Sequence, residues 1–179
     1  SNYPFVGTNT EFSDDTLLNG LQSRTITDKP ENGKIYDAII KNVKGEKVGI
    51  FGLTTEETNG ISSPGSVAFE NYIERAQATV KALEAQGVNK IVALTHIGYD
   101  DNALVDNDLL LAKAVDGIDL IVGGHSHTQL DQPVAISKDS EGNAKDVTII
   151  VQGYQYADFL GTVTLEFDED GVISNFDGE

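Results

Sequence analysis

Three histidines are the residues of this chain best suited to chemistry, and they are the only histidines among its 179 residues. His125 and His127 stand one residue apart behind the pair Gly123-Gly124, and His96 directly follows the apolar run KIVALT. Imidazole nitrogens bind zinc, iron, manganese and copper, so three imidazoles brought together would form one side of a metal site. The residue type alone does not select the metal.

A second interpretation of the same histidines stays open, because a lone histidine at the end of a strand is often an ordinary polar residue. Thiolate ligands are excluded, since the chain has no cysteine. The glycines of GIFGLT and IVGGHSH match neither a P-loop nor a dinucleotide-binding fingerprint, and no Ser-His-Asp arrangement is apparent. The metal site is therefore the sharpest chemical hypothesis that the residues offer.

The elements that would position the histidines can be predicted from periodicity. Apolar residues at helical spacing predict helices over 68–86 and 102–115. Ser66 is the expected N-cap of the first helix and Gly87 its expected stop. Earlier in the chain, two strands rich in β-branched residues are expected to form a hairpin, with strands at 35–43 and 47–53 around the turn Lys44-Gly45-Glu46.

Continuous apolar runs at 89–98 and 118–124 are typical of strands that are covered on both faces. Strand, helix, strand, helix, strand in that order predicts a parallel α/β layer. Right-handed crossovers place the loops that follow parallel strands at one edge of the sheet, where ligands bind in open α/β sheets. We therefore expect His96, His125 and His127 to converge at this edge.

The end of the chain has a different pattern. Short runs rich in β-branched residues predict antiparallel strands, with a turn at Glu169-Asp170-Gly171, over 133–138, 146–153 and 161–176. With no repeat or linker in the sequence, we expect a single domain over 1–179. The fold class is thus α/β, a parallel layer followed by C-terminal antiparallel strands.

The composition argues against a nucleic-acid partner and against a membrane-spanning segment. The chain has 12 basic and 29 acidic residues and a formal net charge of −17, which would repel a nucleic-acid polymer. No apolar run approaches the roughly 18 residues of a transmembrane helix, so no transmembrane segment is expected. A small phosphate ester stays compatible with this charge if metal ions reverse the field locally.

Several segments together resemble a known family. GEKVGIFGLTTEET, VALTHIGYDDN, GIDLIVGGHSHTQL and IVQGYQYADFLGTVTLEFDEDG are similar to the calcineurin-like metallophosphoesterases, in their 5′-nucleotidase and 2′,3′-cyclic-nucleotide 2′-phosphodiesterase branch. The resemblance implies part of a metallophosphoesterase sandwich and hydrolysis of nucleotides by a two-metal mechanism. It also implies that His96 and His125 bind one divalent ion and His127 the other, with manganese, zinc, iron and calcium not distinguished.

The chain also departs from this family. The family's Asp-x-His, Gly-Asp and Gly-Asn-His-Glu segments are absent, so the chain matches the second half, the C-terminal portion, of a catalytic domain. We therefore expect the isolated chain to be inactive and to self-associate through an uncovered flank of its sheet. No residue is assigned a catalytic or substrate-binding role, but Thr54, Thr55 and Tyr154 are candidates to line the cleft.

Two further expectations complete the sequence analysis. Asp100 and Asp101 are candidates to orient an imidazole, although solvated loop carboxylates are the simpler interpretation. The resemblance implies an exported parent protein, extracellular or attached to the cell wall of a bacterium. The alternatives are a non-catalytic half-domain that binds a metal or a partner, and a structural α/β layer whose histidines are incidental.

Overall fold

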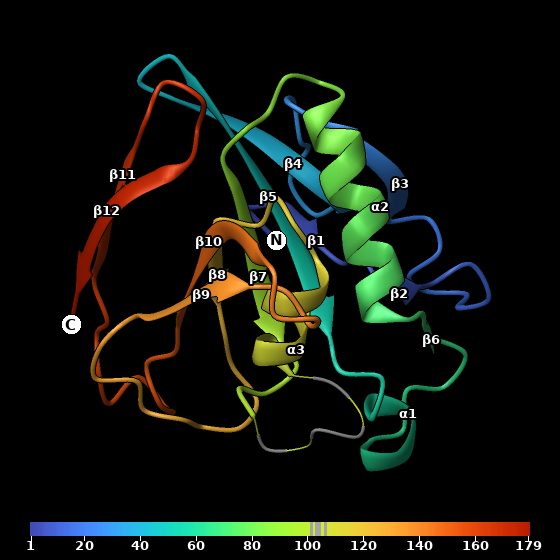
Figure 1. The fold of residues 1–179 in the computed structure, drawn as a ribbon. Coiled ribbons are helices and arrows are strands. Elements are labelled where there is room, and N and C mark those ends of the chain that lie inside the picture. Colours follow the sequence, from blue (N-terminus) through green and yellow to red (C-terminus); the bar gives the residue numbers. More distant parts are fainter. Residues whose placement is uncertain (101, 103–104, 106) are drawn as a thin grey trace.

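The computed structural model of the chain describes residues 1–100, 102, 105 and 107–179 and is built around one mixed sheet. This sheet has eight strands in the order β1-β4-β5-β7-β8-β10-β9, with β3 also paired to β4 (Figure 1). Its strands are β1 (Phe5–Val6), β3 (Gln22–Thr27), β4 (Ile35–Val43), β5 (Glu46–Thr54), β7 (Ile91–His96), β8 (Leu120–Val122), β9 (Val134–Lys138) and β10 (Ala144–Val151). The expected α/β fold class is confirmed.

The predicted hairpin is present as β4 and β5, which pair antiparallel from Ala38–Phe51 to Val43–Glu46. Lys44 and Gly45 at its turn both have positive φ angles, of 54° and 99°, as a two-residue hairpin loop requires. The first 30 residues contain strands that periodicity did not reveal. Among them, β3 runs parallel to β4, and β2 (Thr10–Glu11) pairs with β6 (Ala68–Phe69).

The long helix begins later than the sequence suggested. Helix α2 spans Tyr72–Glu84, and its N-cap is Asn71 rather than Ser66. The Asn71 carboxamide oxygen accepts a hydrogen bond from the Glu74 backbone N–H at 3.0 Å, which satisfies one free donor of the first turn. The helix ends before Gly87, whose φ of 73° no helix accommodates, so the predicted stop is confirmed. A short helix α1 (Thr58–Ile61) was not predicted.

The second predicted helix, over 102–115, is shorter in the structure. Helix α3 spans Asp108–Ala114, because the side chain of Asn107 caps it by accepting a hydrogen bond from the Leu110 backbone N–H at 2.7 Å. Asn102 lies outside any helix, and residues 101, 103, 104 and 106 lie outside the described residues. The capping preference of Asn107 thus fits the start of helix α3 at Asp108.

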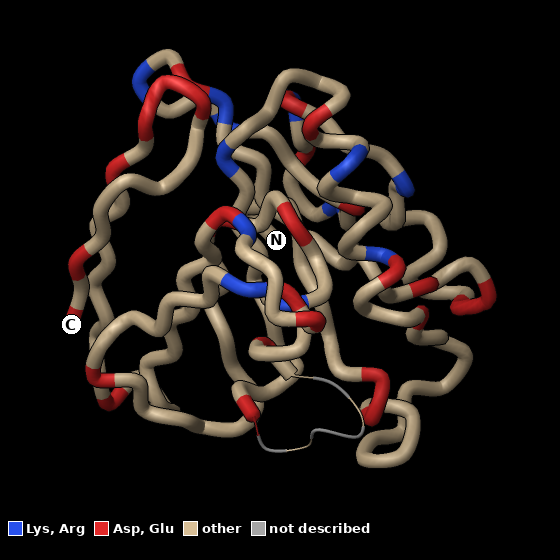
Figure 2. The backbone as a smooth tube through the Cα atoms, viewed as in Figure 1, with Lys and Arg blue, Asp and Glu red and all other residues tan. Residues whose placement is uncertain are grey.

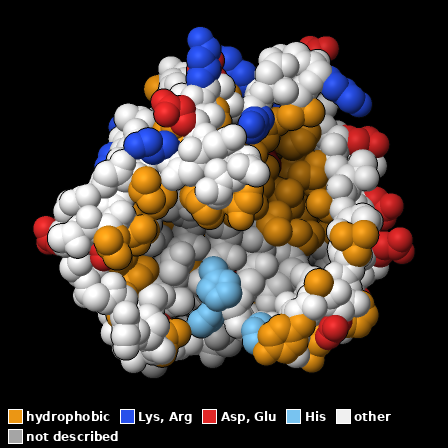
Figure 3. All heavy atoms as spheres, turned by 180° about the vertical axis from the view of Figure 1, so that it is seen from behind, with side chains coloured by type: hydrophobic (Ala, Val, Ile, Leu, Met, Phe, Trp, Pro, Cys, Tyr) orange, Lys and Arg blue, Asp and Glu red, His pale blue; other side chains and the backbone are white. Residues whose placement is uncertain are grey.

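One face of the sheet is covered and forms the core. Helix α2 lies across this face, and its Ala76, Val80 and Leu83 are packed with Phe51 and Ala93 of the strands (Figure 1). On the opposite face the sheet is less covered, since the side chains of Leu94 and Val122 are 42% and 38% exposed. Viewed from behind, the molecule is hollowed, with hydrophobic side chains inside the hollow (Figure 3).

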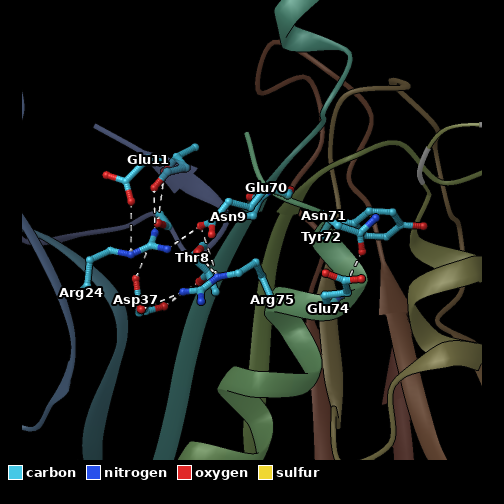
Figure 4. Close-up of polar contacts among 12 residues, drawn as sticks. Thr8, Asn9, Glu11, Arg24, Asp37, Glu70, Asn71, Tyr72, Glu74 and Arg75 are labelled. Carbon is cyan, nitrogen blue, oxygen red and sulfur yellow. Dashed lines mark hydrogen bonds and ion pairs between the residues drawn. The ribbon is translucent and has the colours of Figure 1, made fainter. Parts of the chain in front are cut away.

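An ion-pair network joins the first strands to helix α2 (Figure 4). Arg75 of α2 donates from Nη2 to the Asp37 carboxylate at 2.9 Å and from Nε to the Thr8 carbonyl at 3.0 Å. Arg24 of β3 binds Glu70 and lies near the same Asp37. Because the charges are partly buried and share partners, this network fixes β4 against the helix better than an isolated surface pair would.

The end of the chain contains the expected antiparallel pairs. Strands β9 and β10 pair antiparallel, and β11 (Val163–Phe167) and β12 (Ile173–Gly178) form a separate hairpin. Its turn contains Gly171 with a φ of 88°. Strand β10 also runs parallel to β8, and therefore extends the parallel set by one strand. None of the helices in the described part of the chain is long and apolar enough to cross a bilayer.

We expect stability to depend on pH because of a partly buried carboxyl, that of Asp119, which directly precedes β8. Burial is the largest effect and raises the pKa of Asp119 from 3.8 to about 7. The hydrogen bond that its carboxylate accepts from the Ile91 backbone N–H at 2.7 Å acts in the opposite direction and lowers the pKa. The folded state therefore holds a proton that the unfolded state has lost between about pH 4 and pH 7. Stability falls as the pH rises through this window, by up to roughly 4 kcal/mol.

Asp119→Asn keeps a hydrogen-bond acceptor for Ile91 but cannot ionise. We expect the free energy of unfolding, measured in urea, to fall less for this variant than for the wild type between about pH 5 and pH 8. Parallel pH profiles for the two proteins would contradict the assignment.

Candidate metal centre

Parallel pairing brings the carboxyl ends of three strands to one edge of the sheet. Thr54 at the end of β5 is in register with His96 of β7, and Leu94 of β7 with Val122 of β8. The loops that follow are joined by hydrogen bonds, from the Thr55 backbone N–H to the His96 carbonyl and from Gly98 to Gly124, both at 3.0 Å. The predicted edge is therefore formed.

Two of the three histidines are direct neighbours at this edge. The ring centroids of His96 and His125 lie 5.0 Å apart, with the rings inclined at 68°. The ring of His127 lies beside Tyr156, with centroids 5.8 Å apart. Seen from behind, the histidine side chains lie within the hollowed face of the molecule (Figure 3). The structure thus places His96 and His125 together and turns His127 toward an aromatic ring.

His96 and His125 supply only part of the ligands that a metal ion needs. Within the described ranges 1–100, 102, 105 and 107–179, no three His, Cys, Asp or Glu side chains are arranged to hold a metal ion. His96 and His125 are two neutral-nitrogen donors of the kind that zinc and related ions take. Burial lowers the pKa of His96 below its ordinary value, and His125 and His127 lower it further, which favours the neutral form that can bind a metal.

A carboxylate that the sequence analysis missed lies next to this pair. Glu57 Oε2 is 3.9 Å from His125 Nε2, and Asn102 Nδ2 donates to Glu57 Oε1 at 3.0 Å. Glu57 comes three residues after the end of β5, a strand whose end lies beside His96. Residues that follow parallel strands meet at one edge of the sheet, which is how the histidines were selected. The same reasoning, applied to the loop after β5, would have selected Glu57.

The other candidate residues have mixed placements. Thr55 is 1% exposed, and its backbone N–H bonds to His96, so it supports the edge instead of lining an open cleft. Thr54 is half-buried. Tyr154 is 37% exposed, with its ring 6.0 Å from Phe159. Asp100 is an exposed loop residue, and Asp101 lies outside the described residues.

The backbone at the histidine pair is unusual. His125 and His127 have φ angles of 80° and 54°, in the left-handed region that non-glycine residues rarely adopt. Such a conformation costs of order 1–3 kcal/mol at each residue and persists only where neighbouring contacts hold it. Tyr154, Tyr156 and Ala157 in the facing loop also have positive φ angles. Strained backbone therefore concentrates around the histidines.

The two glycines before His125 allow other groups to come close. A Cβ atom on Gly123 would overlap Oδ2 of the fully buried Asp108 and lie 3.1 Å from Nε2 of Gln152. A Cβ on Gly124 would lie 3.2 Å from Nδ1 of His96. Asp108 is fixed in turn by a hydrogen bond from the Thr95 hydroxyl at 2.7 Å. The Gly-Gly pair is thus required by close packing behind the histidines.

Comparison with known proteins points to one group of enzymes. The chain is 45% identical over 177 residues to the trifunctional nucleotide phosphoesterase YfkN of Bacillus subtilis, covering 96% of this chain and 11% of that protein. It is 38% identical over 151 residues to a 5′-nucleotidase of Diplobatis ommata, covering 79% of this chain and 25% of the relative. No protein-family model matches the sequence.

A solved structure gives the same picture. A 5′-nucleotidase precursor from Thermus thermophilus superposes with a TM-score of 0.80 at 35% identity, covering 97% of this chain and 32% of that one. The similarity thus extends over nearly the whole chain. The chain itself spans between a tenth and a third of the length of these three proteins.

The packing at Gly123 gives a testable prediction. Gly123→Ala forces a methyl group against the buried Asp108 carboxylate, and overpacking of this kind costs about 1–3 kcal/mol. We expect a lower free energy of unfolding in urea. Gly20→Ala is the matched control, because a Cβ at Gly20 meets nothing within 4 Å. Equal stability of the two variants would show that the loop is not packed as described.

Proposed function

The chain belongs to the 5′-nucleotidase group of the calcineurin-like phosphoesterases, and on that premise we propose that its parent protein hydrolyses phosphate esters of nucleotides with bound divalent metal ions. In this proposal the chain is the C-terminal portion of the catalytic domain and supplies part of the metal centre. The similarity over nearly its whole length favours this enzyme over a non-catalytic half-domain or a structural layer.

The observation that carries the proposal is the pair formed by His96 and His125. Two imidazoles whose centroids lie 5.0 Å apart, one at the end of β7 and one in the loop after the adjacent parallel strand β8, can direct nitrogen atoms at one shared ion. His127, on the same loop as His125, would serve a second ion together with ligands from outside this chain. The remaining ligands of both ions would also come from outside, since no three His, Cys, Asp or Glu side chains of the described residues are grouped to hold an ion.

The charge distribution supports a metal-dependent site. The loops 54–57, 96–100, 123–130 and 152–160 at the carboxyl edge contain no lysine or arginine. Figure 2 shows the basic residues elsewhere, away from the loops at the lower end of the view. A nucleotide phosphate would therefore find no cationic side chain of this chain at the site, and divalent ions would have to supply the positive charge.

The roles of this chain's own residues follow from their contacts. When bound, the divalent ions would polarise the phosphoryl group and activate the attacking water. His96 and His125 would hold one ion through imidazole nitrogens. Glu57, which accepts a hydrogen bond from Asn102, has its carboxylate 3.9 Å from His125 Nε2, beyond hydrogen-bond distance, and in this proposal it adds negative charge beside the imidazole. His125 and His127 of the His-x-His segment both have left-handed backbone angles.

The wider setting is also part of the proposal. We propose export of the parent from a bacterial cell, to the extracellular space or the cell wall, on the strength of the family resemblance. Nucleoside monophosphates, cyclic nucleotides and other phosphate esters are all compatible with this proposal. The metals would be two divalent ions, drawn from manganese, zinc, iron and calcium.

Zinc titration of the chain tests the metal role. We expect His96→Ala and His125→Ala each to weaken zinc binding about 10-fold or more in isothermal titration calorimetry, because each removes one of two converging donors. Gln132→Ala, in the exposed loop after β8, is expected to bind zinc like the wild type. Unchanged zinc affinity in both histidine variants would refute the shared site.

Hydrolysis assays test the catalytic role. We expect the isolated chain with added manganese to show little or no turnover of a chromogenic phosphodiester, since its donors alone do not assemble two ions. The intact parent is expected to hydrolyse nucleotides and to lose most of this activity as His125→Ala. Turnover by the isolated chain comparable to that of the parent would contradict the assignment.

A further inference from the structure

We propose that Gln152 is a positioning residue for the metal centre, holding the His-x-His segment by hydrogen bonds on both sides of its two histidines. Gln152 directly follows strand β10, the neighbour of β8 in the sheet. Gln152 is only 3% exposed, so its side chain is buried. This proposal rests on the proposed metal role of His96 and His125 and adds a residue that does not touch the ion.

The carboxamide of Gln152 reaches both ends of the segment. Its Oε1 accepts a hydrogen bond from the backbone N–H of Thr128 at 2.7 Å, directly after His127. Its Nε2 donates to the carbonyl of Gly124 at 3.5 Å, directly before His125. A carboxamide has both a donor and an acceptor, so one side chain can hold the two flanking peptide groups.

A second set of contacts connects the same carboxamide to the His96 loop. Gln152 Oε1 also accepts from the Ser126 hydroxyl at 3.3 Å. The Ser126 oxygen in turn accepts a hydrogen bond from the backbone N–H of Tyr99 at 3.0 Å. Ser126 lies between the two histidines, and Tyr99 comes three residues after His96. Gln152 therefore fixes the two loops relative to each other as well as the shape of one of them.

The strained backbone explains why such a clamp is needed. His125 and His127 both adopt left-handed φ angles, which a free loop would leave. The backbone bonds from Leu130 to the Gln152 carbonyl and from Tyr154 to the Thr128 carbonyl anchor only the far end of the loop. Two shorter contacts span one histidine each, from the Ser126 backbone N–H to the Gly124 carbonyl at 3.1 Å and between the Ser126 and Thr128 hydroxyls at 2.8 Å. The side chain of Gln152 spans both histidines, so its loss should let the imidazoles separate while the sheet stays intact.

The test compares Gln152→Met with the wild type in two measurements. The first is the nuclear Overhauser contact between the imidazole protons of His96 and His125 in the metal-free chain, and the second is zinc affinity by calorimetry. Methionine fills a similar volume but makes neither hydrogen bond. We expect the imidazole contact to be lost and zinc affinity to fall about 10- to 100-fold.

Thr148→Val is the matched control for a purely structural effect. Thr148 is a fully buried polar residue of strand β10. Its hydroxyl donates to the Ile118 carbonyl at 2.7 Å, just before β8 and at the end of that strand away from the histidines. The control is expected to lose stability in urea yet keep both the imidazole contact and the zinc affinity. Losses in the control equal to those in Gln152→Met would overturn the proposal.

Ser126→Ala provides a second variant if Gln152→Met does not fold. It removes the link between Gln152 and Tyr99 in a half-buried loop, so we expect a weaker imidazole contact with the fold retained. An unchanged imidazole contact in the folded variants overturns the proposal. The imidazole contact in the metal-free chain also distinguishes failure of this proposal from failure of the proposed metal site. It tests the positioning role of Gln152 even if the wild type binds no zinc.

Discussion

The side-by-side pairing of parallel strands is the constraint on which the rest of this structure depends. Strands β5, β7, β8 and β10 lie next to one another and point the same way, so their following loops meet at one edge of the sheet. His96 ends β7, and the loops after β5, β8 and β10 contribute Glu57, His125 and Gln152 to the site. A change of register between any two strands would separate groups that are now in contact.

A second level of order lies in the histidine loop itself. Helices α2 and α3 pack with the strands in the core, and His125 and His127, with their left-handed conformation, lie outside this cluster. That conformation depends on close packing that only glycine permits at Gly123 and Gly124, and on the buried carboxamide of Gln152. The strained backbone that positions the imidazoles therefore lowers the stability of the fold, as is common at functional sites.

The sequence predicted those features that depend on apolar periodicity and strand order. The α/β class and the meeting of His96 with His125 followed from the buried runs before them. The N-cap of α2 could not be predicted from apolar periodicity. Asn71 lies between β6 and α2, and its position depends on the pairing of β6 with β2. The strand-end argument reaches Glu57 only when it is extended to the loop after β5, and the role of Gln152 depends on side-chain contacts that no spacing along the chain reveals.

The account's central claim is that His96 and His125 share one metal ion. X-ray absorption spectroscopy of the zinc-loaded chain measures this most directly. The account predicts two imidazole ligands per zinc, at Zn–N distances of about 2.0–2.1 Å. A spectrum with one imidazole or none, and oxygen ligands in their place, would contradict it.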